Sequence, residues 1–226
     1  MLRKITISIA VAALIMFGGS TTAQASTLIL ESVPFDSVDT GSRGGTDVDA
    51  DQFLGWRFDL NSRLNVTDIG GTFFGFSSIP NRNIFGAIIS LNGIDALPLG
   101  NPFLPEEVLA VTTLTTPIGH NDLLTPLEVR LEPGNYALVF GSGLFGATGS
   151  SVMSFLQGSP RSSSVFFWDV DTPPLEARWV NTVSPNRFVI VGSTSVPETS
   201  PVLSFLCVVT LGFGSALLRR HQGKDK

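Results

Sequence analysis

The densest group of carboxylates in the sequence is Asp47, Asp49 and Asp51, which alternate with small apolar residues. Several carboxylate oxygens on one loop are ligands that Ca²⁺ prefers. The spacing begins like an EF-hand loop, but Gln52 stands where that loop needs its glycine and Phe58 where it needs its glutamate, which excludes an EF-hand. Two interpretations remain, a calcium site of another loop type and a solvated acidic loop. Calcium is the only cofactor that the sequence suggests.

Aromatic side chains with polar neighbours offer a second kind of chemistry, stacking against sugar rings. Phe166, Phe167 and Trp168 are consecutive, and strand side chains alternate between two faces, so these three cannot all point into one core. We therefore expect at least one to be exposed or to lie under a loop. Trp168 and Trp179 are the candidate glycan contacts, and the alternative is ordinary core packing, which accounts for most aromatic residues.

Groups typical of catalysis are sparse. His120 is the only histidine between residues 26 and 195, in a stretch that reads as a turn, and no Gly-x-Ser-x-Gly elbow accompanies it. The single cysteine, Cys207, lies outside that region, which excludes a disulfide framework or a Cys-ligated zinc site there. We predict no catalytic residue and no enzymatic activity.

The charge of the central region also excludes a class of function. Residues 26–195 contain 8 Arg, no Lys and 17 acidic residues, a net charge of −9. A protein that binds nucleic acid needs a basic face to displace counterions from phosphates. We therefore predict no nucleic-acid partner.

The N-terminus has the three parts of a secretory signal peptide. Arg3 and Lys4 are positive, residues 5–17 are apolar, and Ala23-Gln24-Ala25 has the small-x-small pattern of a cleavage site. The apolar run of 13 residues is too short for a spanning helix, which needs about 20. We predict that signal peptidase removes residues 1–25 by cutting after Ala25; the alternative is a short anchor that is never cut.

The C-terminus has a similar order of parts. Val196-Pro197-Glu198 lies in a polar break, the next 17-residue apolar stretch is uncharged, and Arg219-Arg220 follows at once. As a helix, such a stretch spans about 25 Å. It can cross a hydrocarbon core of about 30 Å if the bilayer or the flanking residues adjust to the shorter length. The arginine pair should stay cytoplasmic. We predict a linker at residues 193–201, a transmembrane helix at 202–218 and a basic cytoplasmic tail at 219–226. The alternative is a buried C-terminal strand or helix.

These C-terminal residues resemble the PEP-CTERM sorting signal of proteins exported by Gram-negative bacteria and cyanobacteria. Those tails read Val-Pro-Glu-Pro-Ser, then an apolar span, then an arginine-rich end. Here Val196-Pro197-Glu198-Thr199-Ser200 departs from the pattern only at Thr199, where the family usually has its second proline. The resemblance implies that an exosortase, a membrane transpeptidase, cuts near the motif. The product would then be released, or handed to the envelope or the exopolysaccharide matrix.

Between the two ends, apolar residues recur with a period of two, which predicts strands and not helices. Leu54, Trp56, Phe58 and Leu60 alternate with small or polar residues, and Trp56 is therefore expected in the core. The clearest hairpin joins 127–131 to 136–140 through the turn Pro133-Gly134. Further strands are predicted at 27–31, 64–69, 72–76, 84–91, 108–115, 164–169, 177–181 and 187–192. About ten short strands with regular turn signals predict an all-β domain at 26–192, an antiparallel β-sandwich or jelly roll.

Three segments of this domain follow a recurring pattern, Gly55-Trp56-Arg57-Phe58, residues 64–70, and Leu131-Glu132-Pro133-Gly134-Asn135-Tyr136. They resemble β-sandwich domains of carbohydrate-binding-module type that are commonly attached to this sorting signal. The likeness covers residues 53–141 and implies fold more than activity.

Together with these resemblances, the patterns predict an exported protein of the envelope or extracellular matrix, of structural or binding type, associated with exopolysaccharide or biofilm. Its expected partners are signal peptidase and exosortase as processing enzymes, and the membrane through residues 202–218 before processing. The alternative is a calcium-dependent glycan-binding or adhesion module. An extracellular hydrolase is the least favoured alternative.

Overall fold

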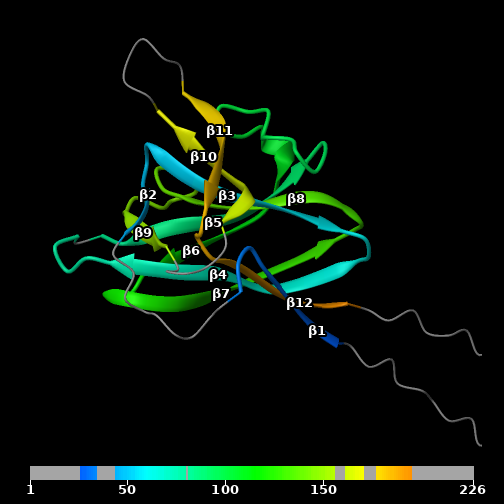
Figure 1. Ribbon diagram of the computed structural model, residues 1–226, viewed down its shortest axis with the longest axis horizontal. Coiled ribbons are helices and arrows are strands. Elements are labelled where there is room, and N and C mark those ends of the chain that lie inside the picture. Colours follow the sequence, from blue (N-terminus) through cyan, green and yellow to red (C-terminus); the bar gives the residue numbers. More distant parts are fainter. Residues whose placement is uncertain (1–25, 35–43, 80, 156–160, 171–176, 195–226) are drawn as a thin grey trace, which may run out of the picture. The chain divides into compact units, whose positions relative to one another are not determined.

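Strands dominate the part of the chain that the computed structural model describes, namely residues 26–34, 44–79, 81–155, 161–170 and 177–194 (Figure 1). These residues belong to one unit, Ala25–Pro197. The segments predicted as signal peptide, sorting motif and transmembrane helix lie outside the described residues. Within the described ranges, no helix is both long enough and apolar enough to cross a membrane.

Two antiparallel six-stranded sheets make up the unit. Sheet A has the order β1-β12-β4-β9-β2, with β7 paired to the other edge of β4. Its strands are β1 (Ser26–Glu31), β2 (Gly45–Val48), β4 (Leu64–Gly75), β7 (Gly119–Leu131), β9 (Ser151–Ser154) and β12 (Phe188–Thr194). Sheet B has the order β11-β10-β3-β8-β5-β6. Its strands are β3 (Gln52–Leu60), β5 (Asn83–Leu91), β6 (Val108–Thr115), β8 (Gly134–Gly141), β10 (Ser162–Asp169) and β11 (Arg178–Ser184). One 3₁₀ turn, η1 (Pro105–Glu107), precedes β6.

The main core lies between the two sheets. Sheet B contributes the apolar positions of β3 and the row Tyr136, Leu138 and Phe140 of β8, while sheet A contributes large side chains such as Phe73 and Phe188. The period-two prediction for β3 is confirmed, and Trp56 is buried as expected. The all-β prediction is therefore confirmed as two antiparallel sheets that share a core.

The hairpin predicted for 127–131 and 136–140 is wrong. β7 pairs with β4 in sheet A, whereas β8 pairs with β3 and β5 in sheet B. The chain bends at Pro133, directly before β8 begins at Gly134, but this bend carries the chain from one sheet to the other. Turn residues specify that a chain reverses direction, and they do not specify which sheet receives the next strand.

A second connection crosses between the sheets at the same place. Leu60 pairs with Gly134 in sheet B, and Leu64 pairs with Leu131 in sheet A. The ribbon of β3 and β8 therefore continues into the ribbon of β4 and β7 around one shared corner. This corner fixes the register of β3 with β8 in sheet B and of β4 with β7 in sheet A.

Side chains tie the two crossings together. The Tyr136 hydroxyl donates to the Glu132 carbonyl oxygen at 2.7 Å, and the Arg63 guanidinium donates to the Glu132 carboxylate at 2.9 Å. The Arg63 hydrogen bond holds the pKa of Glu132 below its ordinary value. Burial raises the pKa of the Tyr136 phenol, and the nearby Glu132 charge adds to this effect.

Several strand boundaries differ from the predictions. The glycines Gly70 and Gly71 were expected in a turn between two strands, but they lie inside the continuous strand β4. A Cβ at Gly70 would overlap the Leu123 carbonyl oxygen of β7, and one at Gly71 would overlap the Arg187 carbonyl oxygen. These glycines let neighbouring backbones approach β4 closely. The short strands β2 and β9 and the first half of β7 had no strong apolar alternation and were not predicted.

The end of the domain also differs slightly from the prediction. β12 continues to Thr194, two residues beyond the predicted boundary at 192. β1 starts at Ser26, and Ser26 pairs with Thr194, so the first and last described strands lie side by side (Figure 1).

Sheet B has a second apolar cluster on its outer face. It contains Phe53, Phe85, Val139, Phe166 and Trp179, among other residues. The connection between β5 and β6 covers it, because Leu97 and Phe103 pack against the cluster. Glu107 shapes this connection, since its buried carboxylate accepts hydrogen bonds from three backbone N–H groups, those of Leu99, Gly100 and Leu104.

Candidate binding groove on the outer face of sheet A

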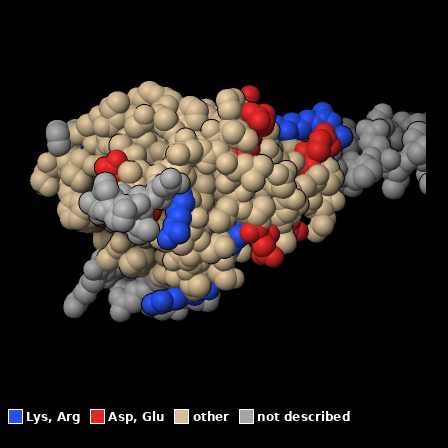
Figure 2. Space-filling model, turned by 90° about the horizontal axis from the view of Figure 1, so that it is seen from above, with Lys and Arg blue, Asp and Glu red and all other residues tan. Residues whose placement is uncertain are grey.

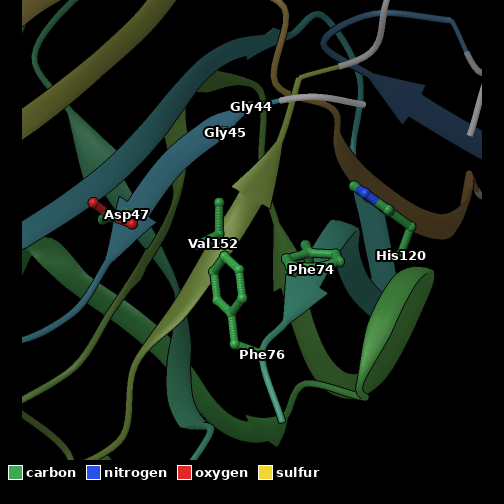
Figure 3. Close-up of a pocket in the computed structure, with 7 residues that line it drawn as sticks. All are labelled: Gly44, Gly45, Asp47, Phe74, Phe76, His120 and Val152. Carbon is green, nitrogen blue, oxygen red and sulfur yellow. The ribbon is translucent and has the colours of Figure 1, made fainter. Parts of the chain in front are cut away.

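A groove of about 370 Å³ crosses the outer face of sheet A (Figure 3). Strands β2, β9, β4 and β7 contribute to it, together with the residues just before β2 and just after β4. Its lining residues are Gly44, Gly45, Asp47, Phe74, Phe76, His120 and Val152. All of them are described residues.

Strand alternation places the aromatic side chains of the groove. Phe73 points inward and is fully buried, so its neighbour Phe74 points outward. Phe74 pairs with Val152 of β9 on one side and with His120 of β7 on the other. The register therefore brings side chains from three strands into one row.

The rings of this row are in contact. The Phe74 and Phe76 centroids are 4.6 Å apart with an interplanar angle of 85°, and the Phe74 and His120 centroids are 4.5 Å apart. Phe76 is 44% exposed. The groove thus presents an open aromatic surface, which Figure 3 shows beside Val152.

Two polar groups flank the rings. His120 Nδ1 and Ser154 Oγ are 3.0 Å apart, which holds the imidazole in place. Asp47 is exposed on β2, and its carboxylate has no hydrogen-bond partner among the described residues. This carboxylate is therefore available to a ligand.

A network of charged side chains lies next to the groove on the same face. The buried Arg187 donates to the Asp122 carboxylate at 2.5 Å and to the Glu31 carboxylate at 2.8 Å. Thr72 also donates to Asp122, at 2.5 Å. One guanidinium is thus balanced by two carboxylates, and Asp122 is held by partners other than His120.

The structure gives His120 a different position from the predicted turn. It lies on β7, near the start of the strand. Its hydrogen-bond partner Ser154 is fully buried, so that hydroxyl is not positioned to attack a substrate. The contact orients the imidazole and does not form an accessible nucleophile–base pair.

Of the three aspartates of the calcium hypothesis, Asp47 lies on β2, and Asp49 and Asp51 lie in the turn between β2 and β3. Asp49 Oδ1 accepts the backbone N–H groups of Asp51 and Gln52 at 2.9 and 2.8 Å, and Asp47 faces the groove. Among the described residues, no group of three or more His, Cys, Asp or Glu side chains could hold a metal ion. The calcium hypothesis gains no ligand group from these positions and stays a prediction.

The structure places the two predicted glycan contacts in the interior. Trp168 is 4% and Trp179 is 8% exposed. Their ring centroids are 5.3 Å apart, and Trp179 Nε1 donates to the Pro102 carbonyl oxygen at 2.7 Å. These positions leave no open ring face for a sugar, because the β5–β6 connection covers this part of sheet B. The related prediction is confirmed: Phe166 and Trp168 lie on the outer face under that connection, and Phe167 packs toward the main core.

The groove residues Phe74 and Phe76 were missed at the level of sequence, although a signal was present. Phe73 and Phe74 are adjacent on a strand, so one of them must point away from the main core. The alternation argument that was used for Phe166–Trp168 would also have identified Phe74 as an outward-facing ring.

The fold and the groove define an all-β protein of two antiparallel sheets with an open, partly aromatic site on one sheet face. No protein-family model and no curated protein matches this sequence.

Proposed function

We propose that the chain is an exported protein of the cell envelope or extracellular matrix that binds exopolysaccharide through the groove on sheet A. It acts by binding and not by catalysis. In this proposal residues 1–25 direct export, and Val196-Pro197-Glu198, the apolar stretch 202–218 and Arg219-Arg220 direct sorting by an exosortase.

The observation that carries the binding proposal is the open row of rings, Phe74, Phe76 and His120, with the Asp47 carboxylate in the same groove. A sugar ring has apolar C–H faces that pack against aromatic rings and hydroxyl groups that need hydrogen-bond partners. A mainly apolar lining with a few placed polar groups is the usual composition of a small-ligand site. This groove combines both kinds of group.

The order of parts at the two ends of the sequence supports the export proposal. Arg3 and Lys4, an apolar run and Ala23-Gln24-Ala25 precede the described strands, and Val196-Pro197-Glu198, an uncharged apolar stretch and Arg219-Arg220 follow them.

Terminal peptide mapping of the protein from its native host tests the export proposal. Mass spectrometry of envelope and medium fractions should find an N-terminus at Ser26 and a C-terminus within or near residues 196–200. Recovery of the full chain, with both ends intact, from the cytoplasmic fraction would contradict it.

The binding proposal is tested by titrating the mature domain with exopolysaccharide fragments from the native host. Phe76→Ala should weaken binding about tenfold or more, while the protein remains folded. Phe145→Ala is the control, because Phe145 is also 44% exposed and packs on other phenylalanines, edge-on against Phe85 and stacked on Phe103, but in a loop beside sheet B. Equal effects of the two substitutions would contradict the groove as the site. A loss of binding on calcium chelation would support the calcium-dependent alternative.

A further inference from the structure

The charges around the groove indicate which class of glycan it accepts. We propose that the groove selects a glycan with free, protonated amino groups, such as a de-N-acetylated hexosamine polymer, over a uronic-acid glycan. This inference rests on the proposed function, since it names the ligand class of the same site.

Asp47 is the one Asp, Glu, Lys or Arg among the described lining residues of the groove. It is exposed on β2 and lines the same groove as Phe74 and Phe76. Its carboxylate can accept a charge-assisted hydrogen bond from a sugar ammonium group, which is stronger than a bond between neutral groups. An N-acetyl group would offer only a neutral amide at this position.

The described part of the groove offers no lysine or arginine to a carboxylated sugar, because none of these side chains is among its described lining residues. The neighbouring Arg187 on the same face already binds two carboxylates, those of Asp122 and Glu31. A uronate placed here would meet the Asp47 carboxylate, with no lysine or arginine among the described lining residues to pair with it.

The charge of the whole region acts in the same direction. Residues 26–195 carry a net charge of −9 and contain no lysine. Figure 2 shows a face on which charged side chains form only isolated groups among uncharged surface. A polyanion is repelled by such a net charge over the range of the Debye length, whereas a polycation is attracted.

The rings add a second preference for a cation. The electron-rich face of an aromatic ring attracts an ammonium group that lies within about 6 Å of the ring centre. Phe76 is the most accessible of the groove rings, and Phe74 contacts it edge-on. An amino sugar can therefore use its C–H face and its ammonium group on the same aromatic surface.

The test compares four hexasaccharides, made of glucosamine, N-acetylglucosamine, glucose or galacturonate. Their binding to the mature domain is measured by isothermal titration calorimetry at about pH 6. The glucosamine hexamer should bind about tenfold more tightly than the N-acetylated one, and the galacturonate hexamer should bind most weakly. Asp47→Asn should remove most of this difference. Asp95→Asn is the matched control, since it removes one exposed acid from the β5–β6 connection, away from the groove, and should leave the preference in place.

Three results would overturn the inference alone, and a fourth would overturn the proposed function with it. Equal binding of the glucose and glucosamine hexamers, with both lost in Phe76→Ala, would overturn the selectivity while the proposed function stands. Tightest binding of the galacturonate hexamer would also overturn it. If Asp47→Asn and Asp95→Asn weaken the preference for the glucosamine hexamer equally, the net charge of the domain alone would explain that preference. If neither these hexamers nor the host exopolysaccharide binds, the proposed function fails together with the inference.

Discussion

The outer face of sheet B is apolar and covered, whereas the outer face of sheet A is polar, charged and partly open. On sheet B, Phe53, Phe85 and Trp179 lie beneath the connection between β5 and β6. On sheet A, the outward residues include Thr72 and Asp122, which are hydrogen-bonded to each other, and Phe74 and His120, which line the groove. The two faces are therefore stabilised by different forces, one by burial of apolar surface and the other by hydrogen bonds and ion pairs.

This difference explains why the two predicted glycan contacts, Trp168 and Trp179, are buried. A large aromatic side chain near polar neighbours suggests an exposed platform, but Trp168 and Trp179 belong to the covered face. The smaller rings Phe74 and Phe76 belong to the open face. Which aromatic rings reach solvent depends on which sheet the long connections cover.

The largest expected effect concerns the covered face. Trp179→Ala should lower the free energy of unfolding by about 3–5 kcal/mol, because Trp179 packs against four other aromatic rings and donates a buried hydrogen bond. Urea unfolding followed by circular dichroism measures this. A loss below about 1 kcal/mol, as is usual for surface positions, would show that the cluster is not a second core.

The next effect concerns the connection that covers sheet B. Glu107→Ala removes a buried carboxylate that accepts three backbone N–H groups, and the free energy of unfolding should fall by about 2–3 kcal/mol. Hydrogen exchange should show the amides of Leu99 and Leu104 opening more often than in the unaltered protein. The neighbouring Glu106, which is exposed, is the control, and Glu106→Ala should leave both measurements unchanged. Unchanged exchange in Glu107→Ala would contradict the bracing of this connection by the carboxylate.

A smaller effect, sensitive to salt, is expected on the open face. Arg187→Met should lower the free energy of unfolding by about 1–2 kcal/mol, less than for a fully buried pair, because solvent screens the partly exposed carboxylates of Asp122 and Glu31. The stability difference between this variant and the unaltered protein should shrink in 1 M NaCl, where the Debye length is about 3 Å. The loss in Trp179→Ala should change little with salt. If the stability losses of the two variants depend equally on salt, the two faces are not stabilised by different forces.

The smallest effect lies at the corner that both sheets share. Arg63 holds the pKa of Glu132 below its ordinary value of 4.5. The folded state therefore gains from this carboxylate at neutral pH, and the gain is lost as the pH falls through the lowered pKa. Glu132→Gln should change the unfolding temperature slightly at neutral pH and not at all well below that pKa. A large change at neutral pH would mean that the exposed pair anchors the corner.

Sequence alone determined the all-β class, the core face of β3 and β8, and the existence of most strands. Local rules suffice there, because apolar residues that alternate with a period of two can be buried together only on one face of a strand. The acidic charge of the domain follows from its amino-acid composition. The pattern of segments at the two chain ends follows from the order of residues there. The predicted export and sorting follow from that order and remain predictions.

Only the tertiary structure decided which strands pair and which outer face is open. Pro133-Gly134 marks a turn, but the pairing of Leu64 with Leu131 and of Leu60 with Gly134 shows that it joins two sheets. Likewise Asp47, Phe74 and His120 are far apart in the sequence, and the register of β2, β9, β4 and β7 brings them together. Pairing between distant strands depends on the packing of the whole core, so no short segment contains the information that positions this groove.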